Sequence, residues 1–435
     1  MRLPAVHWEH SGLTAAALRS AEEKLSGELA RMRDATGTLY DDDRGSINLP
    51  LDKHHLRACQ ALARKHAKAS LLVVVGIGGS NLGTIAVQEA ILGKLHNLRP
   101  GKRVLYADTV DPDQMAVIAA LLDDELRKGR HVVIDAISKS GTTTETIANL
   151  EILLGVLRQR KRDPKRHVIV TTDADSRLWT LAKDEGFETL AIPRLVGGRY
   201  SVLSPVGLFP LALLGVNITA LLDGAAHMRA ACLRTGHAEN PAIARAALIA
   251  LARSEGRNIA DHFVFKTDFE AIGKWYRQLM GESIGKEWDA QRKNRVWMGI
   301  TPTVSVGSTD LHSMAQLYFG GPNDKLFTIV TIERWARDTG VPRMERYGAL
   351  APDIQGKRLG RIMDAIAHGV TSVMNAQKRP YCRIELPDAS EFSIGALLQL
   401  HMMEMMFLAP LLDVNPFDQS NVEAYKEETR KALAK

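Results

Sequence analysis

Apolar and polar positions in the first half of the chain alternate between two patterns, one typical of buried strands and one of helices. Short runs of β-branched apolar residues are expected for parallel strands that are buried on both faces of a sheet. The segments between these runs carry apolar residues at helical spacing. We therefore predict strands at 71–75, 104–107, 131–137, 167–172 and 187–192, and helices at 81–95, 112–126, 147–157 and 176–185.

The same alternation returns in the second half, after an apolar helix that ends near residue 222 and an amphipathic helix over 240–256. Strands that alternate with helices predict βαβ units and an α/β fold class. The chain is therefore expected to hold two doubly wound lobes, each with a parallel sheet. In the second lobe we predict strands at 258–266, 295–300, 325–332 and 381–386, and helices at 270–287, 309–320, 358–377 and 391–412.

The segment 225–238 is less regular than its neighbours and separates the two predicted lobes. The residues before the first strand read as amphipathic helices, and the last residues begin irregularly and end as a helix. The predicted segments are an N-terminal helical segment at 1–69, a first lobe at 70–225, a second lobe at 238–410 and a C-terminal helical arm at 411–435.

Composition narrows the class of partner. The chain has 435 residues, of which 45% are hydrophobic and 24% charged, as is ordinary for a globular protein. Its formal net charge of +6 is spread along the sequence, whereas a nucleic-acid footprint gathers basic residues on one face. We therefore expect an anionic small-molecule substrate and no nucleic-acid partner.

Cysteine spacing and apolar stretches bear on the compartment. Cys59, Cys232 and Cys382 are too far apart for a metal motif or a disulfide framework, which fits a reducing cytoplasm. The N-terminus has no basic start followed by an apolar core, so no signal peptide is expected. The apolar stretches 207–222 and 392–414 are short or interrupted, which predicts buried helices and no membrane span.

A hydroxyl-rich turn, SKSGTTTET at Ser138–Thr146, lies between a predicted strand and a predicted helix. A helix N-terminus offers unpaired N–H groups and partial positive charge, which suit an anion. The turn adds six hydroxyls, the charge of Lys139 and the flexible backbone of Gly141. We interpret it as a phosphate cradle. The alternative is a plain capping box with Glu145 reaching back, although a cap needs only one or two hydroxyls.

The glycine-rich stretch GIGGS at 76–80 is a weaker signal. It resembles part of a dinucleotide fingerprint, but that site needs an acidic residue about 20 residues on, and Asp108 lies further away. We favour glycines that let the backbone approach a sugar, including Gly79, with Ser80 near its phosphate.

Four further residues are candidates for chemistry, each with an ordinary alternative. Arg199 beside two glycines could stabilise an oxyanion or simply pair with a carboxylate. Glu282 lies at a glycine-containing break in a helical pattern, and could equally be a surface residue. His312 shares a predicted helix face with Gln316 but has no second ligand at zinc spacing, and such a histidine is usually structural. Lys426 lies in a terminal helix, where a lysine is normally exposed.

Together the motifs resemble the glucose-6-phosphate isomerase (phosphoglucose isomerase) family in its compact bacterial form. The first two motifs are also shared with the wider sugar-isomerase (SIS) domain superfamily, and the remaining four are more specific. They occur in the family's order between about residues 70 and 430, as GIGGSNLG, SKSGTTTET, GGRYS, GESIGK, the HSMAQ helix and NPFDQSNVEAYK.

That resemblance implies two SIS-type, flavodoxin-like lobes and interconversion of glucose 6-phosphate and fructose 6-phosphate in glycolysis and gluconeogenesis, without a metal or organic cofactor. It implies that Glu282 is the catalytic base, that Arg199 stabilises the enediolate, and that His312 and Lys426 help to open the sugar ring. It also implies a homodimer in which His312 reaches the partner's site. The implied substrate-binding residues are Gly79, Ser80, Ser138, Lys139, Ser140, Thr142, Thr143, Gln278 and Gln419.

Two other functions remain open at this stage. A sugar-phosphate-sensing SIS module would keep the phosphate turn but would need neither Glu282, His312 nor Lys426. An isomerase for another sugar phosphate, such as mannose 6-phosphate or an amino sugar, would share the same turn. The presence of all three residues argues against the sensor.

Overall fold

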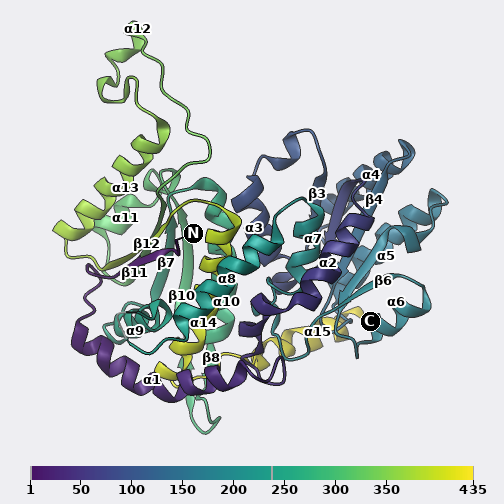
Figure 1. The fold of residues 1–435 in the computed structure, drawn as a ribbon, viewed down its shortest axis with the longest axis horizontal. Helices are drawn as coiled ribbons and strands as arrows, with labels where there is room; N and C mark the ends of the chain where they lie inside the picture. Colours follow the sequence, from purple (N-terminus) through teal and green to yellow (C-terminus); the bar gives the residue numbers. More distant parts are fainter. Residues whose placement is uncertain (1, 237–238, 435) are drawn as a thin grey trace.

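The computed structural model describes residues 2–236 and 239–434 and contains two α/β lobes that lie side by side (Figure 1). The first lobe holds a sheet with the strand order β3-β2-β4-β5-β6, and every pair in it is parallel. This is a flavodoxin-like order, as expected for a doubly wound lobe. Its strands are β2 (Ala69–Val75), β3 (Arg103–Ala107), β4 (His131–Ile137), β5 (Val168–Thr172) and β6 (Glu188–Ala191).

Alternate residues of the first sheet enter two different apolar cores. In β2, Leu71 and Val73 pack in one core with α4 and α5, whereas Leu72 and Val74 pack in the other. Burial on both faces explains why these strands read as continuous apolar runs. The helices of this lobe are α3 (Leu82–Leu92), α4 (Pro112–Arg127), α5 (Thr144–Gln159), α6 (Arg177–Asp184) and α7 (Pro205–Leu213).

The second lobe repeats this winding with one added edge strand. Its sheet has the order β1-β12-β11-β7-β10, parallel except for β1, which pairs antiparallel with β12. Its strands are β1 (Ala5–His7), β7 (Ile259–Val264), β10 (Thr301–Val306), β11 (Lys325–Ile332) and β12 (Tyr381–Leu386). The helices around it are α9 (Pro241–Ser254), α10 (Glu270–Ile284), α11 (Ala315–Gly320), α12 (Glu345–Gly348), α13 (Leu359–Ala376) and α14 (Glu391–Leu411).

Three sequence predictions need correction in detail. The strand expected at 295–300 is β9 (Arg295–Met298), which forms a separate two-stranded hairpin with β8 (Lys286–Trp288), and the sheet strand is β10. The helix expected to run to residue 287 ends at Ile284, because β8 begins two residues later. The apolar stretch 207–222 spans the end of α7 and the start of α8 (Ile218–Cys232), with Gly215 at a positive φ of 93° between them.

Helices join the lobes and the terminal segments. From the N-terminal stretch, α2 (Lys53–Lys65) packs against α7, whereas α1 (Ala15–Ala35) packs against α14 and α9. β1 was not expected in this stretch. Residues 237 and 238, at the predicted start of the second lobe, lie outside the described residues, and the predicted segment boundaries stay predictions.

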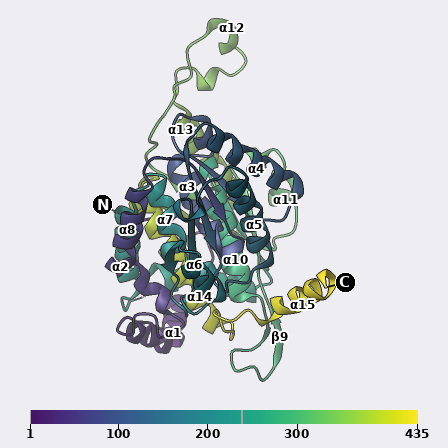
Figure 2. The ribbon, with the colours of Figure 1, turned by 90° about the vertical axis from the view of Figure 1, so that its right-hand side faces the viewer.

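The helix α14 is buried between its neighbours. By length and composition it could cross a membrane, but 89% of its apolar window is buried inside the molecule, as expected for a core helix. It packs against α8, α9 and α10. By contrast, α15 (Glu423–Leu433) has no buried residue and stands away from the body (Figure 2).

Candidate active site

The phosphate turn follows β4 at the carboxyl edge of the first sheet. Ser138 is buried, and its hydroxyl bonds to the Thr143 hydroxyl at 2.9 Å and accepts the Gly141 N–H at 3.1 Å. Gly141 has φ of +69°, and a Cβ there would lie 2.8 Å from the Leu178 Cβ, so glycine is required. These contacts fix the turn around the start of α5.

The capping-box interpretation of this turn is not supported by its geometry. Thr143 occupies the N-cap position of α5, but its side chain makes no capping hydrogen bond. Within the described residues, no side chain accepts a hydrogen bond from the first amides of α5, as an anion site requires. Ser140 and Thr142 are exposed beside them. Thus the hydroxyls and the helix start converge where a phosphate could bind.

Lys139 contributes charge at the side of this turn. Burial lowers the pKa of its ammonium group below the usual range, and Asp173 partly offsets that shift. Lys139 and Ser140 line a polar cavity of about 350 Å³ together with Asp173, Asp175, Ser176 and Arg194. The cavity shows that the turn is open to a ligand on this side.

Gly79 serves packing in this structure. A Cβ at Gly79 would lie 2.3 Å from the carbonyl carbon of Gly198, so the two backbones touch. Gly79 and Ser80 lie in the short 3-10 helix Gly78–Ser80, and Gly198 opens the 3-10 helix Gly198–Tyr200. The close approach brings Arg199 next to the glycine-rich turn. Whether Gly79 also contacts a substrate stays a prediction.

Arg199 lies at the centre of the candidate site. Its side chain is 1% exposed, and its five N–H donors make five hydrogen bonds. They go to the Ser283 hydroxyl at 2.9 Å, the Glu282 carboxylate at 3.3 Å, the Gln419 side-chain oxygen at 3.1 Å, the Asp418 carbonyl at 3.3 Å and the Pro416 carbonyl. Ser283 is also bonded to the Tyr200 hydroxyl at 2.9 Å.

Glu282 lies in the last turn of α10, which packs across the lobe interface against α3 and the 3-10 helix carrying Arg199. One carboxylate oxygen accepts from the Arg199 guanidinium, and the other accepts from the Gln278 amide at 2.9 Å. The Glu282 side chain is 33% exposed, so a ligand can reach it. We call Arg199, Gln278, Glu282 and Gln419 the inner group.

The inner group can support proton transfer next to a carbonyl. A carboxylate accessible to a ligand can remove a weakly acidic proton, provided that a nearby positive group stabilises the oxygen that becomes negative. Arg199 supplies that charge beside Glu282. Both residues are held by hydrogen bonds before any ligand arrives, which reduces the reorganisation that the reaction requires.

His312 and Lys426, which we call the outer pair, lie apart from the inner group. His312 is exposed and follows the 3-10 helix Thr309–Leu311, so it does not share a helix with Gln316, contrary to expectation. Among the described residues its side chain has no hydrogen-bond partner. Lys426 lies on α15 and pairs with Glu423 at 2.7 Å. Neither side chain bonds to the inner group in this chain.

Three residues that hold the inner group in place were not predicted from the sequence, namely Ser283, Lys286 and Asp418. Ser283 is fully buried between Arg199 and Tyr200, and Lys286 binds the Asp418 carboxylate at 2.8 Å. All three lie inside motifs that were recognised, next to residues with assigned roles. The only available signal was their polar character within those motifs, and it did not identify their partners.

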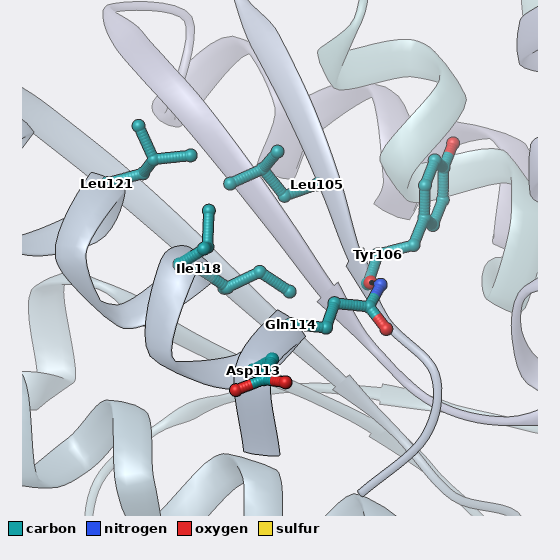
Figure 3. A pocket seen from close by; sticks show the side chains of 7 residues that line it. Leu105, Tyr106, Asp113, Gln114, Ile118 and Leu121 are labelled. Atoms are coloured by element: carbon teal, nitrogen blue, oxygen red, sulfur yellow. Dashed lines mark hydrogen bonds between the residues drawn. The ribbon is translucent and has the colours of Figure 1, made fainter. Parts of the chain in front are cut away.

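A second cavity lies away from this site. It has a volume of about 420 Å³ between β3 and α4, where the side chains of Leu105, Ile118 and Leu121 face one another (Figure 3). Asp113 and Gln114 lie at one end of the cavity. The Gln114 side-chain amide donates a hydrogen bond to the Tyr106 carbonyl at 3.4 Å, on the edge strand β3. Its lining is mostly apolar, so it lacks the converging polar groups of the inner group.

Comparisons with known proteins show which family the chain resembles. A family model described as "Phosphoglucose isomerase" matches residues 55–340. The glucose-6-phosphate isomerase of Rubrobacter xylanophilus is 36% identical over 412 residues, covering 92% of this chain and 91% of that protein. The glucose-6-phosphate isomerase of Carboxydothermus hydrogenoformans is 34% identical over 424 residues, covering 95% of this chain and 89% of that protein.

Solved structures share the fold over the whole chain. A hypothetical protein from Thermus thermophilus superposes with a TM-score of 0.88 at 31% identity, with complete coverage of both chains. A glucose-6-phosphate isomerase from Chlamydia trachomatis has a TM-score of 0.82 at 20% identity, covering 99% of this chain and 88% of that one. The predicted fold class is confirmed, and the chain belongs to the phosphoglucose isomerase family.

Proposed function

We propose that this chain interconverts glucose 6-phosphate and fructose 6-phosphate through an enediolate. The observation that carries the proposal is the pairing of Glu282 with Arg199 beside Gln278, at the edge of the sheet that presents the phosphate turn. Family membership supplies the substrate class, because the curated relatives are named glucose-6-phosphate isomerases. The chain is thus an aldose–ketose isomerase.

In this mechanism the phosphate turn binds one end of the open-chain sugar. The exposed hydroxyls of Ser140 and Thr142, the charge of Lys139 and the uncapped start of α5 support that role, and Ser80 lies at the same sheet edge. Binding at a remote phosphate supplies energy for placing C1 and C2 beside Glu282. Ser138 and Thr143 hold the shape of the turn.

Glu282 acts as the base that moves a proton between C1 and C2. It removes the proton from C2 of the aldose, and electrons move onto the C1 oxygen to form the enediolate. A proton passes from the C2 hydroxyl to the C1 oxygen, and the same carboxyl returns its proton to C1 as the C2 carbonyl forms, which gives the ketose. Arg199 lowers the energy of the enediolate because its guanidinium charge lies beside the oxygen that becomes negative. Gln278 and Gln419 orient the carboxylate and the guanidinium.

We propose that His312 and Lys426 open the sugar ring before proton transfer. We also propose that the protein acts as a homodimer. Ring opening needs a proton taken from the C1 hydroxyl and one given to the ring oxygen. Since His312 is exposed and lacks a bond to the inner group, a partner subunit is the proposed route by which it reaches a site. The proposal places the enzyme in glycolysis and gluconeogenesis in the cytoplasm, without a metal or organic cofactor.

The test is turnover of purified protein on epimeric sugar phosphates. Fructose 6-phosphate would be supplied, and glucose 6-phosphate and mannose 6-phosphate would be quantified separately with stereospecific coupling enzymes. The proposal predicts rapid formation of glucose 6-phosphate. Binding of the sugar phosphate without turnover would show a sensing module, and preferential formation of mannose 6-phosphate would show a different isomerase.

A further inference from the structure

The segment that joins α14 to α15 is held by groups around the inner group. We call residues 415–419 the connector. Three of the five Arg199 hydrogen bonds go to it, at the carbonyls of Pro416 and Asp418 and the side chain of Gln419. The Phe417 ring lies 6.0 Å from the Tyr200 ring, centroid to centroid. The connector therefore forms one wall of the candidate site.

Lys286 binds the connector from the second lobe. It follows α10 by two residues, its side chain is 7% exposed, and its ammonium bonds to the Asp418 carboxylate at 2.8 Å and to the Asp418 carbonyl. A buried ammonium without partners is costly, so Asp418 compensates for the burial of Lys286. Because the two residues are separated by 132 positions, this pair ties the end of α10 to the C-terminal segment.

The position of Asp418 gives the pair a second consequence. Arg199 already donates to the Asp418 carbonyl at 3.3 Å, so the guanidinium that would stabilise the substrate oxyanion contacts the same residue whose carboxylate binds Lys286. Lys286 engages that carboxylate. Without Lys286, the Asp418 carboxylate would be left with Arg199 as an alternative cationic partner and would compete with the substrate.

The connector also determines where α15 lies. None of the described residues of α15 is buried, so the helix has little packing of its own to fix it. Its base is held by the connector and by the Asn421 amide, which donates to the Glu287 carboxylate at 2.8 Å. Glu287 follows Lys286 directly in β8. Movement of the connector would therefore carry Lys426 with it.

We propose that Lys286 and Asp418 form a latch of positioning residues for the isomerisation. The latch holds Gln419 and the base of the Lys426 helix at the site, and it keeps the Asp418 carboxylate from occupying Arg199. This inference rests on the proposed function, and it adds two residues that act through Arg199, Gln419 and Lys426 without touching the reacting atoms.

The test compares Lys286→Met, Lys286→Arg, Asp418→Asn and the double variant Lys286→Met/Asp418→Asn. Lys286→Met should lower kcat by roughly 10- to 100-fold, since small misplacements of catalytic groups cost that much. KM should change little because the phosphate turn is untouched. Lys286→Arg should retain most activity, and the double variant should exceed Lys286→Met, because it removes the carboxylate that competes for Arg199.

A matched control is Lys325→Met. Lys325 is also a buried lysine paired with a neighbouring aspartate, but it begins β11, the middle strand of the second sheet. Lys325→Met should lower the free energy of unfolding as Lys286→Met does, but it should leave kcat unchanged. Equal losses of kcat in both lysine variants would reduce the latch to a general stability effect and overturn the proposal.

Hydrogen exchange of residues 413–422 provides a readout that does not depend on activity. Protection of this segment should fall in Lys286→Met and return in Lys286→Arg. If wild-type protein shows no isomerase activity, the proposed function fails while the exchange result still tests the latch. Unchanged protection in Lys286→Met, or a double variant less active than Lys286→Met, would contradict the proposal.

Discussion

The inner group and the outer pair differ in how the chain holds them. Arg199 is buried and uses every donor, and Glu282 and Gln278 are bonded to each other and to that arginine network. His312 and Lys426 lie on exposed segments, and the contact that Lys426 makes is with its helix neighbour Glu423. In our proposal, the groups for proton transfer are therefore held within one chain, whereas the groups for ring opening lie on segments that must be brought to the site.

The inner group and the outer pair also differ in what places their charged side chains. The inner group lies where the two lobes meet, so packing of α10 against α3 determines its geometry. The outer pair depends on the connector, on α15 and, in our proposal, on a partner subunit. Substitutions in the inner group should thus affect the chemical step in any assay, whereas effects in the outer pair should depend on the form of the sugar supplied.

Removal of the Glu282 carboxylate should have the largest effect. Glu282→Gln keeps the size of the side chain and its acceptor oxygen, but an amide cannot accept the C2 proton. We expect kcat to fall by about 10³-fold or more, within the range of a lost general base. Fructose 6-phosphate binding, measured by calorimetry, should stay close to that of the wild type. Full activity would remove Glu282 from the mechanism.

Arg199→Lys should have the next largest effect. Lysine keeps the charge but has a single ammonium in place of a planar group with five donors, so it cannot hold Ser283, Glu282 and the connector together. We expect kcat/KM to fall by about 10²-fold, comparable to the loss of an oxyanion-stabilising group. Steady-state kinetics would measure it. A loss confined to KM would indicate a binding role instead.

The outer pair should show smaller effects that depend on the sugar supplied. Lys426→Met and His312→Ala should each lower turnover of the ring-closed sugar by roughly 10- to 100-fold, since ring opening also occurs slowly in water. A rapid-mixing assay on the open-chain fraction should show much less loss. Equal losses of turnover on the ring-closed and open-chain sugars would show that the outer pair acts in proton transfer, as the inner group is proposed to do.

Mixing variants tests whether the outer pair comes from a partner. Glu282→Gln and His312→Ala would be unfolded together and refolded as a mixture. If each site combines Glu282 of one subunit with His312 of the other, one site in a mixed dimer carries both substitutions and its second site carries neither. The mixture should then be more active than either variant alone. No recovery in confirmed mixed dimers would place both residues in one subunit's site.

A control region lies at the opposite edge of the first sheet from the phosphate turn. His131 begins β4 and contacts the His66 ring, with the His66 Nδ1 and the His131 Nε2 atoms 2.9 Å apart, and the His167 ring lies beside it. Burial first, and then the neighbouring histidines, lower the pKa of His131 to about 4. Folding therefore favours its neutral form.

The smallest predicted effect follows from that pKa. The unfolded chain binds a proton at His131 below its ordinary pKa of about 6.5, so the associated stability is present above that pH and is lost as the pH falls toward 4. Because His131 is partly exposed, we expect a loss of about 1 kcal/mol between pH 7 and pH 5. Urea unfolding would measure it. His131→Gln should remove this pH-dependent loss of stability, and kcat should be unaffected.

Much of the fold could be predicted from the sequence because its strands are buried on both faces. β4, β11 and β12 were predicted to the residue, since continuous apolar runs leave little ambiguity. β10 was missed because Thr301, Pro302, Thr303 and Ser305 make the run half polar, and the more apolar Arg295–Met298 stretch was chosen instead. A hairpin strand and a sheet strand cannot be distinguished by local pattern alone.

The candidate site was predicted as separate motifs, and only the fold relates them. Nothing in the local sequence at Gly79 shows that its backbone must touch Gly198, because that contact depends on the pairing of two distant turns. The pairing of Lys286 with Asp418 is equally invisible along the chain. The roles of Ser138 to Thr143 and of the inner group stay predictions until substitutions are measured.

The most direct test of the account is the fate of the C2 hydrogen. Glucose 6-phosphate deuterated at C2 would be converted by the wild-type enzyme in ordinary water, and the fructose 6-phosphate formed in the first turnover would be analysed at C1 by mass spectrometry. Proton transfer through Glu282 predicts that part of the deuterium is lost to solvent and that Glu282→Gln abolishes both conversion and exchange. Complete retention of deuterium at C1, or exchange that persists in Glu282→Gln, would contradict the account.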